Sequence, residues 1–379
     1  MHQSSLLSTV KVLQETPTAP FREEWMLDVL DKELSAIDGL RVAIDRFGNR
    51  IVRFKRGRTT GTPVTYIAHV DHPGFIFLDG AAGAGTRHAA IFEGRVLDGF
   101  FVNSPVRLYR SADDAGIRGI IVSASEYIEA SGQREIVIET EEDAEGAVLA
   151  MWDIPPFRLN QGIIEGRACD DLCGCAALIE MLRRLSTGEG DVDVCVLFTR
   201  AEESGFCGLL CFLDEKPMPE LVPANTVFVS VEISSQTASV AVGEGAIIRV
   251  GDRSSTFDGK VVDLLWGLTT RMPNARARRA LMDKGTCEAT PAARAGHRAG
   301  GICCPVDNYH NMDIERGIIS TERVALSDLE AMVDLAAGLA ESSSRGETPQ
   351  YVIPNNYERS LRKGYDRLTA MPLAAQPAS

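Results

Sequence analysis

The sequence predicts an α/β fold in which helices cover both faces of a mixed, largely parallel sheet, with a small β-barrel or sandwich inserted into the chain. Three observations predict this class. Continuous runs of apolar and β-branched residues, typical of strands buried on both faces, occur at Val64–Val70, Val192–Thr199 and Thr226–Ile233. Segments with a helical spacing of apolar residues separate these runs. From about Pro73 to Asn160, by contrast, short alternating runs are divided by turn residues.

The other elements follow in order along the chain. Residues 4–36 predict two amphipathic helices that are divided at Pro17 and Pro20. Gly48 and Asn49 give a turn signal between two further strands. Besides the three buried strands, we expect strands at Leu40–Ile44 and Arg50–Phe54, a helix that begins at Asp170 and Asp171, a helix over Thr256–Met272, a strand at Gly301–Val306 and a helix over Ser320–Leu339.

This order indicates a discontinuous main domain, residues 1–72 and 161–345, around an inserted β-rich domain of residues 73–160. Residues 346–379 form a polar C-terminal tail that contains prolines. The 379 residues are therefore assigned to one interrupted domain and its insert rather than to two domains in series.

Charge and composition exclude several classes of protein. The chain has 39 Lys and Arg residues against 53 Asp and Glu, a net charge of −14. Because nucleic acids and anionic membranes bind basic surfaces, neither is expected as the main partner. No apolar stretch approaches the roughly 18 residues of a membrane-spanning helix, and the N-terminus lacks the pattern of a secretory signal. Nine cysteines, an odd number, do not indicate a disulfide framework, so a reducing cytoplasm is the expected location.

Polar residues stand at five junctions where buried strands or a helix begin or end. In chain order they are His69 with Asp71, Asp170 with Asp171, Glu202 with Glu203, Glu232, and His310. Each could alone be a solvated group or a helix cap, but their joint occurrence at successive strand ends is not explained in this way. Ligands of open α/β sheets collect at these ends, and imidazoles with carboxylates suit divalent cations. The sequence therefore predicts a two-metal hydrolytic centre.

The same segments carry a resemblance to a known family. They read DRFGNRIVRFKRG, IAHVDHPGF, GRACDDLCGCAALIEML, AEESGFCG and GICCPVDNYHNMD. In these segments the chain resembles the co-catalytic metallo-aminopeptidases, which include the tetrahedral, deblocking and glutamyl aminopeptidases and bacterial endoglucanase-like proteins. The similarity extends over about residues 5–340 and includes the insert.

The resemblance implies an enzyme that removes N-terminal residues from short peptides with two divalent metal ions, zinc first and cobalt or manganese as alternatives. The implied ligands are His69 and Glu232 for one ion, Glu203 and His310 for the other, and Asp170 as a bridge. Glu202 would be the general base for a water that bridges the metals, and Asp71 would orient His69. The resemblance also implies a homo-oligomer built from dimers, with a dodecamer as one form, in which the insert is a lid or dimerisation domain.

Departures from the family pattern leave the specificity open. Glu232 stands where the family usually has Asp, and deacylases and carboxypeptidases of the same clan have Glu at this place. The family's Gly-Thr-Asp-Ala loop reads Gly-Thr-Cys-Glu here, and its Arg-Tyr-x-His segment reads Asp-Asn-Tyr-His. We therefore expect Gly285, Thr286, Cys287 and Tyr309 on the substrate side of the pocket. An amidase, deacylase or carboxypeptidase is one alternative, and a metal-binding assembly protein without catalysis is another.

Overall fold

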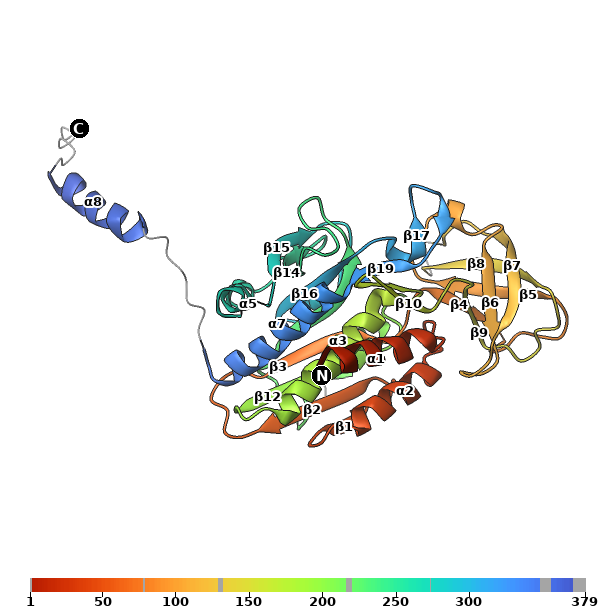
Figure 1. Ribbon diagram of the computed structural model, residues 1–379, viewed down its shortest axis with the longest axis horizontal. Helices are drawn as coiled ribbons and strands as arrows, with labels where there is room; N and C mark the ends of the chain where they lie inside the picture. Colours follow the sequence, from red (N-terminus) through yellow and green to blue (C-terminus); the bar gives the residue numbers. More distant parts are fainter. Residues whose placement is uncertain are drawn as a thin grey trace.

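An eight-stranded sheet forms the centre of the main domain in the computed structural model (Figure 1). The structure describes residues 2–77, 79–128, 132–215, 220–272, 274–347 and 356–370. In chain order the strands of the sheet are β1 (Arg41–Ile44), β2 (Arg50–Arg56), β3 (Val64–His69), β12 (Val192–Thr199), β13 (Val227–Ser235), β14 (Ala246–Asp252), β15 (Ala277–Met282) and β16 (Arg298–Val306). Across the sheet they lie in the order β1-β2-β12-β3-β13-β16-β14-β15. The central strands β12, β3, β13 and β16 are parallel, and β2 and β14 join them antiparallel on either side. The predicted fold class is confirmed.

Alternating side chains along the central strands pack into a core on each face of the sheet. In β12, Val194, Val196 and Phe198 belong to one core, whereas Cys195 and Leu197 belong to another. The first core is covered by α1 (His2–Glu15), α2 (Glu24–Ser35), α3 (Cys169–Thr187), α5 (Gly259–Arg271) and α7 (Leu326–Ser344). The second is covered by α4 (Cys207–Glu215) and α6 (Ala289–Arg294). Because helices cover both faces, these strands bury apolar side chains on both faces rather than on one alone.

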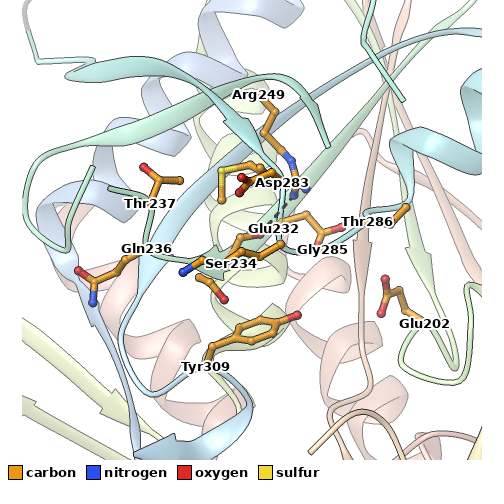
Figure 2. Close-up of a pocket in the computed structure, with 13 residues that line it drawn as sticks. Glu202, Glu232, Ser234, Gln236, Thr237, Arg249, Asp283, Gly285, Thr286 and Tyr309 are labelled. Atoms are coloured by element: carbon orange, nitrogen blue, oxygen red, sulfur yellow. Dashed lines mark hydrogen bonds between the residues drawn. The ribbon is translucent and has the colours of Figure 1, made fainter. Parts of the chain in front are cut away.

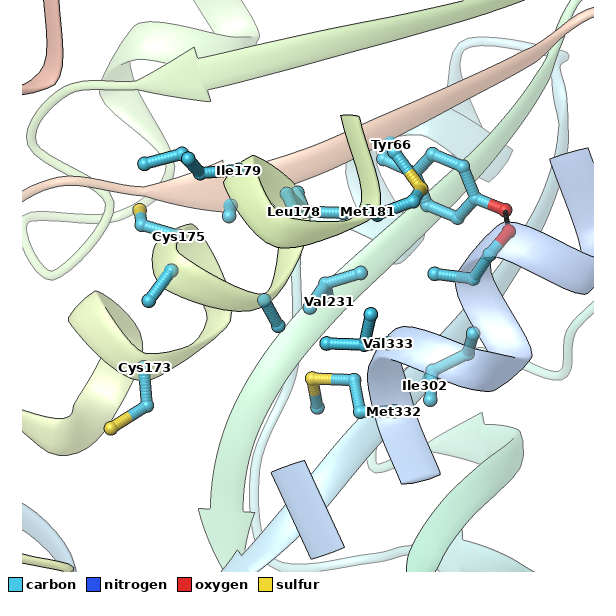
Figure 3. Packing of buried hydrophobic residues seen from close by; sticks show 14 of the residues in the cluster. Tyr66, Cys173, Cys175, Leu178, Ile179, Met181, Val231, Ile302, Met332 and Val333 are labelled. Atoms are coloured by element: carbon cyan, nitrogen blue, oxygen red, sulfur yellow. Dashed lines mark hydrogen bonds between the residues drawn. The ribbon is translucent and has the colours of Figure 1, made fainter. Parts of the chain in front are cut away.

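Helices α3 and α7 pack side by side on one face of the sheet (Figure 3). Leu178 of α3 and Met332 of α7 are fully buried in this layer. The hydroxyl of Tyr66, on β3, donates a 2.6 Å hydrogen bond to the carbonyl oxygen of Ala336 in α7. This bond satisfies the polar group of a large buried side chain and ties α7 to the strand that ends at His69.

Six antiparallel strands form a closed barrel within the predicted insert. In barrel order they are β4 (Gly74–Phe77), β5 (Arg87–Glu93), β8 (Gln133–Thr140), β7 (Ile117–Ala124), β6 (Pro105–Tyr109) and β9 (Leu149–Trp152). Aromatic side chains fill the interior: the ring centroid of Phe75 lies 4.9 Å from those of both Phe92 and Trp152. A short helix, η1 (Asp98–Phe100), follows β5. Closure leaves the barrel without free sheet edges at which another strand could pair.

A three-stranded sheet joins the two domains and changes one expected boundary. It contains β10 (Phe157–Asn160), β11 (Ile163–Gly166) and β19 (Glu322–Ala325). A helix was expected from Ser320, but α7 begins at Leu326, so this part of the prediction is wrong. The reason is tertiary: residues 322–325 pair with β11 and bury Val324, which outweighs their local preference.

The last part of the chain contains one described helix, α8 (Asn356–Ala370), which Figure 1 shows apart from the main domain. The rest of the expected tail, residues 348–355 and 371–379, lies outside the described residues. Within residues 2–347 and 356–370, apart from the short undescribed gaps, no helix is long and apolar enough to cross a bilayer. All nine cysteines are free thiols.

The packing of α3 gives a first testable prediction. Leu178→Ala removes a fully buried side chain from between α3 and the sheet, and we expect it to lower the free energy of unfolding by about 2–5 kcal/mol. Urea unfolding followed by circular dichroism measures this change. Leu361→Ala, at a half-exposed position of α8, is the control and should change the unfolding free energy by less than about 0.5 kcal/mol. A similar loss in both variants would contradict the packing described here.

Candidate metal centre

The predicted ligands meet at one edge of the sheet. Because β3, β12, β13 and β16 are parallel, their carboxyl ends lie together. His69 is the last residue of β3, and the turn that contains Glu202 and Glu203 follows β12. Glu232 lies near the end of β13, and His310 follows β16 in the short helix η2 (Tyr309–Asn311). Asp170 stands at the start of α3. All of these residues except Glu202 and Glu203 are classed as buried, and those two are half-buried.

The side chains form two groups of three that share Asp170. His69, Asp170 and Glu232 make one group, and Asp170, Glu203 and His310 make the other, with the ligand atoms of each group within 4.8 Å of one another. Oδ1 of Asp170 lies 3.5 Å from Nε2 of His69, and its Oδ2 lies 3.6 Å from Nε2 of His310. Each carboxylate oxygen therefore faces a different imidazole, as a ligand that bridges two ions requires.

Several of these ligand atoms are buried without a hydrogen-bond partner. They are Oδ1 of Asp170, Oε1 of Glu203 and Nε2 of His310. Buried polar atoms are rarely left unpaired, since the lost hydration is not compensated. Imidazole nitrogens and carboxylate oxygens together are ligands that zinc and similar divalent ions accept. The residues present therefore fit a metal centre.

Backbone carbonyl groups fix the orientation of both imidazole rings. Nδ1 of His69 lies 3.1 Å from the carbonyl oxygen of Asp71, and Nδ1 of His310 lies 2.7 Å from that of Arg95. Because a carbonyl only accepts hydrogen bonds, each Nδ1 carries a proton, and each Nε2 faces the centre, where it can bind either a cation or a second proton. Arg95 follows β5 of the barrel, so the inserted domain positions one of the ligands.

The turn that presents Glu202 and Glu203 is held through its backbone. Ala201 has a left-handed φ of 50°, and its N–H donates to the carboxylate of Glu23 at 3.0 Å. The carboxylate of Asp71 accepts the N–H groups of Glu202 and Glu203 at 3.0 and 3.1 Å. The same carboxylate lies 3.6 Å from Nδ1 of His69. Asp71, expected from the sequence to orient His69, thus also holds the turn that carries the two glutamates.

Glu322 holds two of the ligands in the same way. Its carboxylate accepts the backbone N–H of Asp170 at 3.0 Å and that of His310 at 2.8 Å. His310 has a left-handed φ of 54°, a conformation that costs energy for a residue with a Cβ atom. The bond to Glu322 helps to compensate this cost. Burial raises the pKa of Glu322 to about 8, whereas the two N–H bonds and the imidazole of His310 lower it and so favour the charged form.

Burial and mutual repulsion shift the pKa values of the centre. Burial raises the pKa of Glu202 well above its ordinary value; His69 opposes this rise, and Glu203 and Glu232 add to it. Burial lowers the pKa of His69 and of His310, but the neighbouring carboxylates outweigh burial and raise both pKa values well above the ordinary value. Without cations, the centre therefore retains protons that exposed groups would lose.

A pocket opens beside the centre (Figure 2). Of the four residues expected on the substrate side, Gly285, Thr286 and Tyr309 line it together with Glu202. The ring of Tyr309 stacks on the imidazole of His310, with 3.8 Å between the ring centroids. Cys287 is not among the lining residues, because its side chain is buried in the core beneath α4 and α6.

The pocket and its support include residues that the sequence analysis did not single out. Arg249, Ser234 and Gln236 line the pocket, and Glu322 supports two ligands. Arg249 has a recognisable signal, since a charged residue interrupts the apolar segment Ala-Ile-Ile-Arg-Val of β14. Glu322 has no such signal, because it stands in a polar stretch that reads as the start of a helix.

These features define a class: an α/β protein with a centre of metal-binding type at the carboxyl ends of its sheet and a barrel inserted after β3. Comparison with known proteins gives the family. Residues 48–335 match the family model described as M42 glutamyl aminopeptidase. The chain belongs to this family.

Solved structures of low sequence identity share the fold. An aminopeptidase from the archaeon Desulfurococcus kamchatkensis matches with a TM-score of 0.71 at 21% identity, over 93% of this chain and 100% of the other. The TET1 peptidase of Pyrococcus horikoshii, which can assemble into a tetrahedron or a large octahedral shell, matches with a TM-score of 0.69 at 20% identity, over 89% and 99%. An endoglucanase of Thermotoga maritima matches with a TM-score of 0.58 at 16% identity, over 89% and 98%.

The raised pKa values of the histidines predict that metal affinity decreases as the pH is lowered. Protons and cations compete for Nε2 of His69 and His310, and because both pKa values lie above 6.5, the competition extends above this pH. Isothermal titration with Zn²⁺ at about pH 6, 7 and 8 should give a Kd that falls as the pH rises, with release of protons on binding. A Kd that is independent of pH would contradict the arrangement described.

Proposed function

We propose that the protein is a metal-dependent aminopeptidase that removes N-terminal residues from short peptides. The observation that carries the proposal is the pair of ligand groups that share Asp170, with buried and unpaired ligand atoms in the group of Glu203 and His310. Membership of the M42 family supports it. The adjoining pocket, which Glu202 lines, could hold the N-terminal end of a peptide beside these groups.

Two divalent ions fit the donor set. His69 and Glu232 would hold one ion, Glu203 and His310 the other, and Asp170 both. Zinc suits two imidazoles with carboxylates, and cobalt and manganese accept the same ligands. When bound, such ions supply a Lewis acid that polarises the scissile carbonyl group and lowers the pKa of water.

We infer that Glu202 acts as the general base. Its Oε2 lies 3.9 Å from Nε2 of His69, and the residue lines the pocket. A raised pKa suits a carboxylate that takes a proton from the attacking water and then gives it to the leaving amine. Asp71 and Glu23 hold the turn that carries Glu202, so the base is positioned before substrate enters.

Glu232 gives a specific reason to test a second activity, that of an amidase, deacylase or carboxypeptidase. The resemblance leads us to expect Asp at this place, and the longer side chain is fixed here by a 2.7 Å hydrogen bond from the hydroxyl of Ser230. Metal-loaded protein should be assayed with aminoacyl anilides, dipeptides and N-acyl amino acids. Turnover of N-acyl amino acids alone would favour the second activity. Binding of metal without turnover of any of these substrates would favour a metal-binding assembly protein.

We also propose that the protein is a cytoplasmic homo-oligomer built from dimers. The shells formed by the TET1 peptidase, which has the same fold, support this proposal. Static light scattering should give a mass that is a multiple of the 41.1 kDa of one chain, up to twelve copies if the largest expected form is reached. A mass of 41.1 kDa would overturn it.

The assignment of Glu202 gives a direct prediction. Glu202→Gln keeps the size of the side chain but removes the base, so turnover should fall by about 10²–10⁴-fold while metal content, measured by mass spectrometry, stays unchanged. Glu189→Gln, at an exposed loop position, is the matched control and should keep full turnover. If Glu202→Gln hydrolyses peptides at the normal rate, another residue is the base.

A further inference from the structure

Tyr309 stands directly before His310 in η2 and is held against it. The two rings stack with an angle of 24° between their planes, and the half-buried ring of Tyr309 also packs against the larger core of the main domain. Hydrogen bonds hold the chain on both sides. Nδ2 of Asn308 donates to the carbonyl oxygen of Thr321 at 2.9 Å, and the N–H of His310 donates to Glu322. The position of the Tyr309 side chain beside a proposed metal ligand is therefore well defined.

The hydroxyl of Tyr309 has no hydrogen-bond partner among the residues that the structure describes. Other tyrosine hydroxyls in the interior are paired, as buried ones usually are. That of Tyr66 donates to a carbonyl oxygen of α7, and that of Tyr109 accepts from a guanidinium group. Figure 2 shows the Tyr309 hydroxyl directed into the pocket, on the side of Glu202. A free donor thus faces the space that the substrate would enter.

Two other hydroxyl groups that line the pocket are already engaged. The hydroxyl of Thr286 lies 2.9 Å from that of Ser254. The hydroxyl of Ser234 accepts a 3.2 Å hydrogen bond from Arg249. Of these three groups, only the hydroxyl of Tyr309 is both without a partner in the described protein and held against a proposed ligand.

Hydrolysis of an amide bond places negative charge on the carbonyl oxygen. The oxygen of water bonds to the carbonyl carbon, the π pair of the C=O bond moves onto its oxygen, and Glu202 takes a proton from the water. When the C–N bond breaks, the pair returns to the C=O bond and the proton passes from Glu202 to the leaving amine. A fixed donor beside this oxygen accelerates the reaction, because the charge is larger in the transition state than in the substrate. A neutral phenol can be such a donor.

We propose that Tyr309 is a catalytic residue whose hydroxyl donates a hydrogen bond to the carbonyl oxygen of the scissile bond as this oxygen becomes negative. The proposal rests on the proposed function, since it adds a residue to the same reaction. The phenol keeps its proton throughout, so Glu202 remains the group that transfers protons. Aminopeptidase and deacylase reactions form the same oxyanion, so the role applies to either activity.

Tyr309→Phe removes the hydroxyl and keeps the ring that stacks on His310. We expect kcat of the metal-loaded protein to fall by at least about tenfold, towards the roughly 10²–10³-fold loss caused by removal of one oxyanion donor. KM, metal content and melting temperature should stay close to those of the wild type, because the hydrogen bond forms mainly in the transition state. Tyr365→Phe, at an exposed position of α8, is the matched control and should keep full turnover. Unchanged kcat in Tyr309→Phe, with or without a higher KM, would overturn the proposal.

A binding measurement separates this proposal from the proposed function. Two analogues of Leu-Gly are used: a phosphinic one, which carries a charged tetrahedral group at the scissile position, and a reduced one, which has a methylene group there. Isothermal titration of the metal-loaded protein tests Tyr309 even if no peptide is hydrolysed. The wild type should prefer the phosphinic analogue, and Tyr309→Phe should reduce this preference at least roughly tenfold. No preference in the wild type, or the same preference in both proteins, would overturn the role of Tyr309.

Discussion

The position of Asp170 between two imidazoles is the constraint on which the rest of the molecule depends. Its carboxylate is buried, and this burial raises its pKa; the adjacent imidazoles of His310 and His69 outweigh burial and lower the pKa below the ordinary value. The side chain can reach both imidazoles only if α3 begins at the carboxyl edge of the sheet. The packing of α3 against α7 and the central strands fixes this starting point.

Three further carboxylates hold the backbone around the proposed metal ligands but are not themselves among the proposed ligands. Glu23, Asp71 and Glu322 each accept two backbone N–H groups around the centre. Burial raises the pKa of Glu23 to about 7. A buried carboxylate is stable as an anion only where hydrogen-bond donors are fixed around it. The same hydrogen bonds fix the backbone of the loop that supplies the N–H groups. Three of the 53 Asp and Glu residues thus serve the structure of the site, in a place hidden from solvent.

The sequence predicts the buried strands and the position of the proposed ligands at one edge of the sheet, because both depend on local patterns. Continuous apolar runs mark β3, β12 and β13, and the polar residues that follow them could be placed at one edge from the parallel order alone. Arg95 and Glu322 could not be predicted in this way. Arg95 acts through its carbonyl oxygen, which every residue possesses, and Glu322 lies in a strand whose pairing with β11 depends on the whole fold.

The hydrogen bond from His310 to the carbonyl oxygen of Arg95 also limits how far the inserted domain could be exchanged. A barrel that only covered the pocket could be exchanged for another module or lost, as loops and inserted domains often are. Here the backbone after β5 completes the surroundings of His310. Replacing the insert would therefore remove a hydrogen-bond acceptor of His310 as well as a cover of the pocket, so the two domains form one functional unit.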